Sequence, residues 1–186
     1  SAFHFDSFRQ FLAERKEKGL STYVLDLMGG RASFLRDLKG PISRESSPPY
    51  PLDIGLCVSL VDERGEGLRD VDKKHSIEIL CGDVTSKNTW NQIDQWQKEK
   101  GIDAFDLIVC RGADAVQEDM VPRALYPFLF GKIWNRLATK NGLFMTHLPE
   151  KTVFPKELLE RLRLIPGVTL HFQPKGNQHD KTYPAL

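Results

Sequence analysis

The sequence is poor in cysteine, with only three among its 186 residues, and no two have the C-x-x-C spacing. An odd, small number of cysteines cannot close a disulfide framework, and the missing C-x-x-C pair excludes a zinc ribbon. Cys57, Cys81 and Cys110 each lie in or at the end of an apolar run. We therefore expect reduced, buried thiols.

Long apolar runs and an excess of charge of one sign are also missing. No run approaches the ~18 residues that span a bilayer, and Ser1-Ala2-Phe3-His4 has neither the charged nor the apolar region of a signal peptide. We therefore expect a cytoplasmic protein without a membrane partner. The 26 basic and 25 acidic residues give a net charge of +1, which gives no support to binding of nucleic acid.

The composition that remains is that of an ordinary globular protein, with 40% hydrophobic and 27% charged residues. We expect one domain over residues 1–186, because this length lies within the range of single domains. A Pro-rich segment at about 40–53 interrupts the pattern, since three prolines in four residues (48–51) continue neither a helix nor a central strand. It is predicted to be a surface loop, either a lid or a plain insertion.

Apolar segments alternate with stretches of helical periodicity along the chain. The predicted strands cover residues 23–28, 54–61, 77–80, 105–110, 143–147 and 168–172. The predicted helices cover residues 6–18, 33–39, 88–100 and 155–163, together with a long helix that starts near Pro122. Trp90, Trp96 and Trp134 recur among apolar residues, which predicts core packing.

Strands that are apolar on both faces and separated by helices indicate a parallel sheet covered on both sides. With right-handed crossovers, this pattern predicts an α/β fold: a three-layer α/β/α sandwich with a mostly parallel, doubly wound sheet of six to seven strands. The histidines show no ligand spacing, so we expect no metal site.

Acidic residues fall at the carboxyl ends of the predicted strands, where open α/β sheets bind their ligands. Asp26 precedes Gly29-Gly30, Asp62 follows the second strand, and Asp83 follows the third. A carboxylate after the second strand can accept hydrogen bonds from two ribose hydroxyls. Asp83 stands where its carboxylate can accept a hydrogen bond from an exocyclic amine.

Five segments resemble, in order, the motifs of class I S-adenosylmethionine-dependent methyltransferases, which have a Rossmann-like fold. They are residues 24–32 (VLDLMGGRA), 59–62 (SLVD), 81–84 (CGDV), 105–110 (FDLIVC) and 137–145 (LATKNGLFM). The resemblance extends over about residues 20–147. It implies S-adenosylmethionine as cofactor and methyl transfer to an acceptor that the sequence does not identify.

The resemblance also implies a set of cofactor-binding residues. They are Asp26, Met28, Gly29, Gly30, Asp62, Glu63, Gly82, Asp83, Val84, Cys110 and Arg111. Asp26 and Gly29 would line the methionine moiety, Asp62 would bind the ribose and Asp83 the adenine. Cys110 and Arg111 would lie near the transferred methyl group.

Two positions depart from the family pattern, because Met28 and Ala32 stand where the family usually has glycine. They motivate an alternative, a degenerate methyltransferase-like domain that serves as a binding or scaffold module. A second alternative is an NAD-binding Rossmann domain. Its Gly-x-Gly-x-x-Gly fingerprint is not matched by residues 29–34 (GGRASF).

The acceptor side of the cleft is predicted from residues after the fourth and fifth strands. His147 is the candidate general base, because an imidazole titrates near neutral pH. Arg111 is a candidate to hold an anionic acceptor through two parallel hydrogen bonds. The other interpretation is that His147 only ends its strand and that Arg111 pairs with Asp114 or Glu118.

Overall fold

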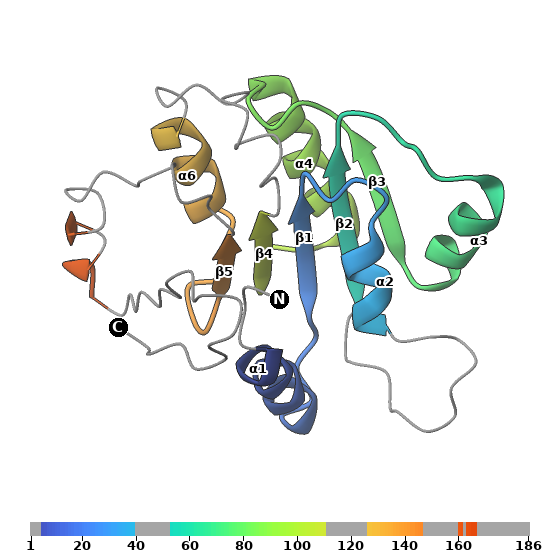
Figure 1. Ribbon diagram of the computed structural model, residues 1–186. Helices are drawn as coiled ribbons and strands as arrows, with labels where there is room; N and C mark the ends of the chain where they lie inside the picture. Colours follow the sequence, from blue (N-terminus) through green and yellow to red (C-terminus); the bar gives the residue numbers. More distant parts are fainter. Residues whose placement is uncertain (1–4, 40–52, 111–125, 147–159, 162, 167–186) are drawn as a thin grey trace, which may run out of the picture.

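The computed structural model describes residues 5–39, 53–110, 126–146, 160–161 and 163–166 (Figure 1). Several predictions concern residues outside these ranges. They are the Pro-rich loop, the start of the helix near Pro122, Arg111, His147, most of the helix at 155–163 and the strand at 168–172.

The strands form one parallel sheet, and the prediction of an α/β fold is confirmed. They are β1 (Tyr23–Leu27), β2 (Ile54–Ser59), β3 (Ile77–Cys81), β4 (Leu107–Cys110) and β5 (Leu143–Thr146). Their order is β3-β2-β1-β4-β5, and every neighbouring pair is parallel. The arrowheads in Figure 1 point the same way. The order is that of a Rossmann-like sheet, and it reverses between β1 and β4, where ligands bind in such folds.

Five helices with assigned bounds connect or precede these strands. They are α1 (Phe5–Glu17), α2 (Ser33–Lys39), α3 (Glu66–Lys74), α4 (Lys87–Lys100) and α6 (Tyr126–Trp134). The Ser86 side chain caps α4 by accepting from the Asn88 N–H at 3.2 Å, and Gly101 ends that helix in the left-handed conformation. Within the parts of the chain described, no helix is both long and apolar enough to cross a membrane.

Two hydrophobic clusters form because side chains alternate between the faces of a strand. Val24 of β1 packs with residues of α1 and α2, including Leu12 and Leu35. Its neighbour Leu25 packs with residues of α4 and α6, including Trp90 and Ile133. The apolar runs of the central strands are thereby buried on both faces.

The structure corrects several predicted details. Helix α3 was not predicted, and β1 ends at Leu27 and β2 at Ser59, so Met28 and residues 60–61 belong to loops. Trp90 and Trp96 are buried as predicted, whereas Trp134 is 47% exposed at the end of α6. Cys57 and Cys110 are buried thiols, but Cys81, the last residue of β3, is exposed.

Candidate functional site at the carboxyl ends of the strands

The loop between β1 and α2 follows an unusual backbone path. Met28, Gly30 and Ala32 all have positive φ, at 56°, 58° and 57°. This left-handed conformation is free of penalty for glycine but costs about 1–2 kcal/mol for a residue with a Cβ. Met28 and Ala32 therefore keep a backbone that suits glycine, at the two positions where the methyltransferase motif usually has it.

Gly29 fits this loop for a different reason, the close approach of neighbouring side chains. A Cβ at Gly29 would lie 2.3 Å from Asp26 Oδ2 and 2.8 Å from Cys57 Sγ. The Gly29 N–H donates to the Val58 carbonyl at 3.2 Å, which ties the loop to β2. Asp26 is fully buried in β1 beneath this turn. The predicted grouping of Asp26, Gly29 and Gly30 is therefore present.

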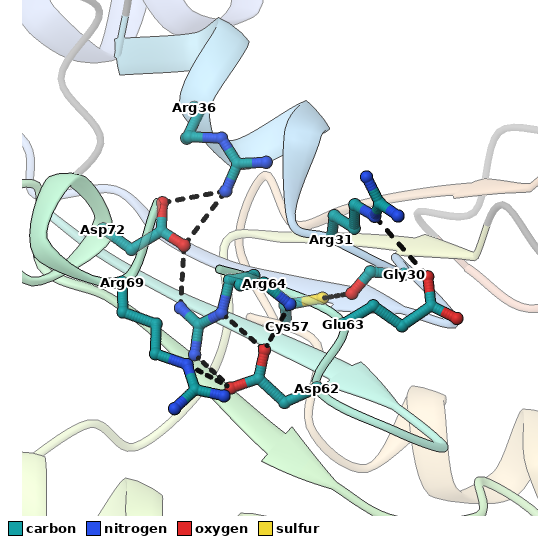
Figure 2. A network of polar contacts seen from close by, with 9 residues as sticks. All are labelled: Gly30, Arg31, Arg36, Cys57, Asp62, Glu63, Arg64, Arg69 and Asp72. Carbon is teal, nitrogen blue, oxygen red and sulfur yellow. Dashed lines mark hydrogen bonds and ion pairs between the residues drawn. The ribbon is translucent and has the colours of Figure 1, made fainter. Parts of the chain in front are cut away.

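Asp62, the predicted ribose ligand, is held by a nearby arginine (Figure 2). Its Oδ1 accepts from the Arg64 backbone N–H at 3.1 Å and from Arg64 Nε at 2.8 Å, and its Oδ2 accepts from Arg64 Nη2 at 3.0 Å. Arg69 Nε lies 3.5 Å from Oδ2. Chiefly because of the Arg64 side-chain bonds, the pKa of Asp62 falls to about 2. The carboxylate is thus ionised and already partnered.

The same arginine reaches a second, fully buried carboxylate. Arg64 Nη1 donates to Asp72 Oδ2 at 2.7 Å, and Arg36 Nη1 of α2 lies 2.9 and 3.0 Å from the two oxygens of Asp72. Asp72 is 0% exposed. We call the chain Arg36–Asp72–Arg64–Asp62–Arg69 the arginine network. It joins α2 and α3 to the loop after β2 (Figure 2).

Glu63 extends the site toward the first loop. Its Oε2 lies 3.5 Å from Arg31 Nε, and both side chains are more than half exposed. Such an exposed pair contributes little stability. It does place the loops after β1 and β2 side by side (Figure 2), so residues 28–31 and 62–64 form one rim.

The loop after β3 contains Asp83, the residue predicted to bind the adenine. Asp83 Oδ1 accepts from the Thr85 N–H at 2.8 Å and from Thr85 Oγ1 at 2.7 Å, an Asx turn. Asp83 is exposed, and its Oδ2 makes no hydrogen bond to the parts of the chain described here. Val84 is buried and accepts from Trp90 Nε1 at 2.7 Å. A carboxylate oxygen of Asp83 therefore faces solvent beside a rigid turn.

Gly82 and Cys110 complete the described part of the predicted set. A Cβ at Gly82 would lie 2.6 Å from Thr89 Oγ1, so glycine lets the loop pass close to α4. Cys110 is the last residue of β4 and is buried in the cluster formed with α4 and α6. Arg111 and His147, the residues predicted on the acceptor side, lie outside the described residues.

A cavity of about 590 Å³ lies away from the position between β1 and β4 where the strand order reverses. It runs along β3, and its lining includes the basic side chains of Arg64, Arg69, Lys73 and Lys100. We do not identify it as the cofactor site, since it follows the edge strand rather than the ends of β1 and β4. Its contact with Arg64 nevertheless places open space beside the arginine network.

The arginine network was not predicted from the sequence. One signal was available, because an Asp side chain tends to accept a hydrogen bond from the backbone N–H two residues on, which brings Arg64 beside Asp62. Within the ranges described, no group of three or more His, Cys, Asp or Glu side chains is arranged to hold a metal ion. The comparisons add no family assignment: no protein-family model matches the chain, and a search of curated proteins found no match.

Proposed function

We propose that this chain is a class I S-adenosylmethionine-dependent methyltransferase that binds its cofactor across the carboxyl ends of β1, β2 and β3. The single observation that carries the proposal is the backbone of residues 28–32. Left-handed residues alternate there with residues of ordinary φ, at the point where the strand order reverses. In such a turn, backbone N–H groups that the chain does not itself use can meet a ligand at the position where the strand order reverses. The N–H groups of Gly29 and Ala32 are used, by the carbonyls of Val58 and Gly29.

The surrounding acids suit the parts of this cofactor. Asp26 lies beneath the turn, Asp62 stands at the end of β2, and Asp83 offers an oxygen beyond β3. In this proposal the buried Asp26 shapes the turn that lines the methionine moiety, Asp62 binds the ribose and Asp83 binds the adenine amine. Glu63, Gly82 and Val84 line the rim between them. The finer fold, a three-layer sandwich with six to seven strands, is part of the same proposal.

The chemistry requires alignment above all. A sulfonium methyl group is already activated, so the protein gains rate by holding the methyl in line with the acceptor nucleophile. A general base is needed only where that nucleophile must lose a proton. Arg111 and His147 remain our candidates for holding the acceptor and accepting the proton.

Calorimetric titration with S-adenosylhomocysteine tests the proposal. We expect binding at one site per chain. Asp83→Asn should weaken it by roughly 1.5–3 kcal/mol, because a carboxylate that accepts from the adenine amine is replaced by a donor. The retained amide oxygen still accepts from Thr85, so the Asx turn is preserved.

The matched control is Asp70→Asn, which removes an exposed carboxylate from α3 away from the loop after β3. It should leave the affinity unchanged. A wild-type protein that shows neither binding heat nor a thermal shift with millimolar S-adenosylhomocysteine contradicts the proposal. Tight binding of NAD instead would indicate the dehydrogenase alternative.

One observation favours the second candidate function, the scaffold module without catalysis. Both oxygens of Asp62 accept hydrogen bonds from Arg64, so the ribose diol has to compete with an arginine already in place. Absence of binding by the wild-type protein, with the fold intact, would support this second candidate.

A further inference from the structure

The bonding capacity of Asp62 limits what its carboxylate can accept from a nucleoside. A carboxylate has about four acceptor positions, two on each oxygen. Oδ1 already accepts twice from Arg64, through the backbone N–H and Nε, and Oδ2 accepts once from Arg64 Nη2. A ribose diol that donates to both oxygens of Asp62 therefore finds no acceptor position left on Oδ1.

The guanidinium of Arg64 is fixed in this position by its second carboxylate. Its side chain is only 9% exposed, and Nη1 bonds Asp72, which is itself held by Arg36. A planar group with donors on both sides cannot release Asp62 by rotating without straining the bond to Asp72. Arg64 is thus a rigid competitor for the hydroxyls of the ligand.

We propose that Arg64 sets the specificity of the Asp62 site, so that a bound nucleoside donates one ribose hydroxyl to this carboxylate, through Oδ2, and not two. The inference rests on the proposed function, because it assumes a ribose at the end of β2. The expected ligand is therefore a nucleoside that needs only one of its two ribose hydroxyls for the hydrogen bond to Asp62. Oδ2 suits this role because its remaining neighbour, Arg69 Nε, is 3.5 Å away and belongs to a half-exposed side chain.

Arg64→Met tests this assignment, since it removes the guanidinium and keeps an unbranched, apolar side chain that reaches about as far as Nε. Asp72 retains Arg36 as a partner. Oδ1 of Asp62 keeps the backbone donor at position 64 and regains one acceptor position. We expect Arg64→Met to bind S-adenosylhomocysteine roughly tenfold tighter or more, the scale of one hydrogen bond to a charged group.

Deoxy ligands make the test specific for the hydroxyls. In the wild-type protein, one of the 2′-deoxy and 3′-deoxy analogues of S-adenosylhomocysteine should bind within about threefold of the parent. In Arg64→Met, both analogues should lose about tenfold, because both hydroxyls then bond Asp62. The matched control is Lys74→Met, which removes an exposed cation from α3 outside the arginine network. It should leave all three affinities unchanged.

The outcomes separate the inference from the proposed function. Equal or weaker binding by Arg64→Met, or a tenfold loss for both analogues in the wild-type protein, overturns the role of Arg64 and leaves the methyltransferase proposal standing. No binding of any ligand by any variant overturns both. Arg64→Lys, which keeps the charge without the planar fork, serves if Arg64→Met does not fold. It should show the same change in smaller degree. NMR titration of the Asp62 carboxyl carbon checks the release directly, since its pKa should rise from about 2 in either variant.

Discussion

The Arg36 guanidinium on α2 lies 2.9 and 3.0 Å from the two carboxylate oxygens of Asp72 on α3. This pair joins two helices on the same side of β1, and Asp72 is completely buried there. Helix α3 has only two apolar residues, Leu68 and Val71, and both are half-buried. The ion pair is therefore a principal tertiary contact of this helix.

Removal of the buried carboxylate should destabilise the fold strongly. Asp72→Ala leaves Arg36 and Arg64 partly buried beside a missing charge, and breaking such a pair costs about 3–5 kcal/mol. Urea denaturation monitored by circular dichroism measures the loss. Asp70→Ala, at an exposed position of the same helix, should change the free energy of unfolding by less than about 0.5 kcal/mol. Equal effects of the two substitutions would show that the network contributes no stability.

The close approach at Gly29 gives a second prediction. Gly29→Ala puts a Cβ 2.3 Å from Asp26 Oδ2 and 2.5 Å from its Cγ, in a region where Asp26 cannot move into solvent. We expect a loss of about 1–3 kcal/mol, the usual cost of overpacking. Gly67→Ala in α3 is the control, because a Cβ there meets nothing within 4 Å. It lies in the first turn of α3, so it should change the free energy of unfolding by less than about 0.5 kcal/mol. A Gly29→Ala protein as stable as the wild type would contradict the packing around Asp26.

Particular residues show why much of the fold could be predicted from the sequence. β1, β2 and β4 are apolar on both faces, and α4 has Trp90, Ile93 and Trp96 at helical spacing. These local patterns suffice for an α/β fold with a parallel sheet. α3 escaped prediction because its fixed position depends on Asp72 meeting Arg36, a residue 36 positions away. Its weaker signals were Glu66 in the first turn and Lys73 and Lys74 in the last.

The candidate site divides in the same way. Acidic residues at strand ends follow from the order of the elements, so the sequence alone suffices to select Asp26, Asp62 and Asp83. The partners of those acids depend on how loops fold back. Nothing in the spacing of Asp62 and Arg64 shows that one guanidinium will donate to both carboxylate oxygens and also reach Asp72.

The partly buried His75 gives a prediction about pH. Burial, followed by the nearby charge of Lys39, holds the His75 pKa below its ordinary value of 6.5, while Asp72 opposes the shift. The folded state therefore binds the proton more weakly than the unfolded state. The stability from neutral His75 is complete above about pH 6.5 and is lost as the pH falls through the folded pKa. Its Nδ1 is buried without a hydrogen-bond partner within the residues described.

His75→Gln should flatten this dependence. We expect the difference in melting temperature between pH 7.5 and 5.5 to be smaller in the variant than in the wild-type protein. The other four histidines are common to both proteins, so the comparison isolates His75. Parallel pH curves would show that His75 titrates alike in the folded and unfolded states.

The different burial of the three thiols predicts the order in which they react with a thiol reagent. Cys81 is exposed at the end of β3, directly before Gly82 and Asp83, whereas Cys57 and Cys110 are buried. In the folded protein, a thiol reagent such as iodoacetamide should therefore modify Cys81 first. The other two should react at the rate of unfolding, since burial denies the reagent access. Mass spectrometry of digested samples identifies the labelled residue, and Cys81→Ser should abolish the fast reaction.

Ligand protection then reports on the adenine position. If the adenine of S-adenosylhomocysteine lies against residues 82–84, it covers the neighbouring Cys81, so saturating ligand should slow the labelling of Cys81 about tenfold or more. Because a ligand that binds only the folded state also suppresses unfolding, Cys57 and Cys110 should be protected as well. The two effects separate in Asp83→Asn at equal occupancy, where protection of the buried thiols persists and protection of Cys81 decreases with the lost adenine contact. Binding that protects the buried thiols but leaves Cys81 fully reactive would place the base away from β3, and Asp83 would then not be its ligand.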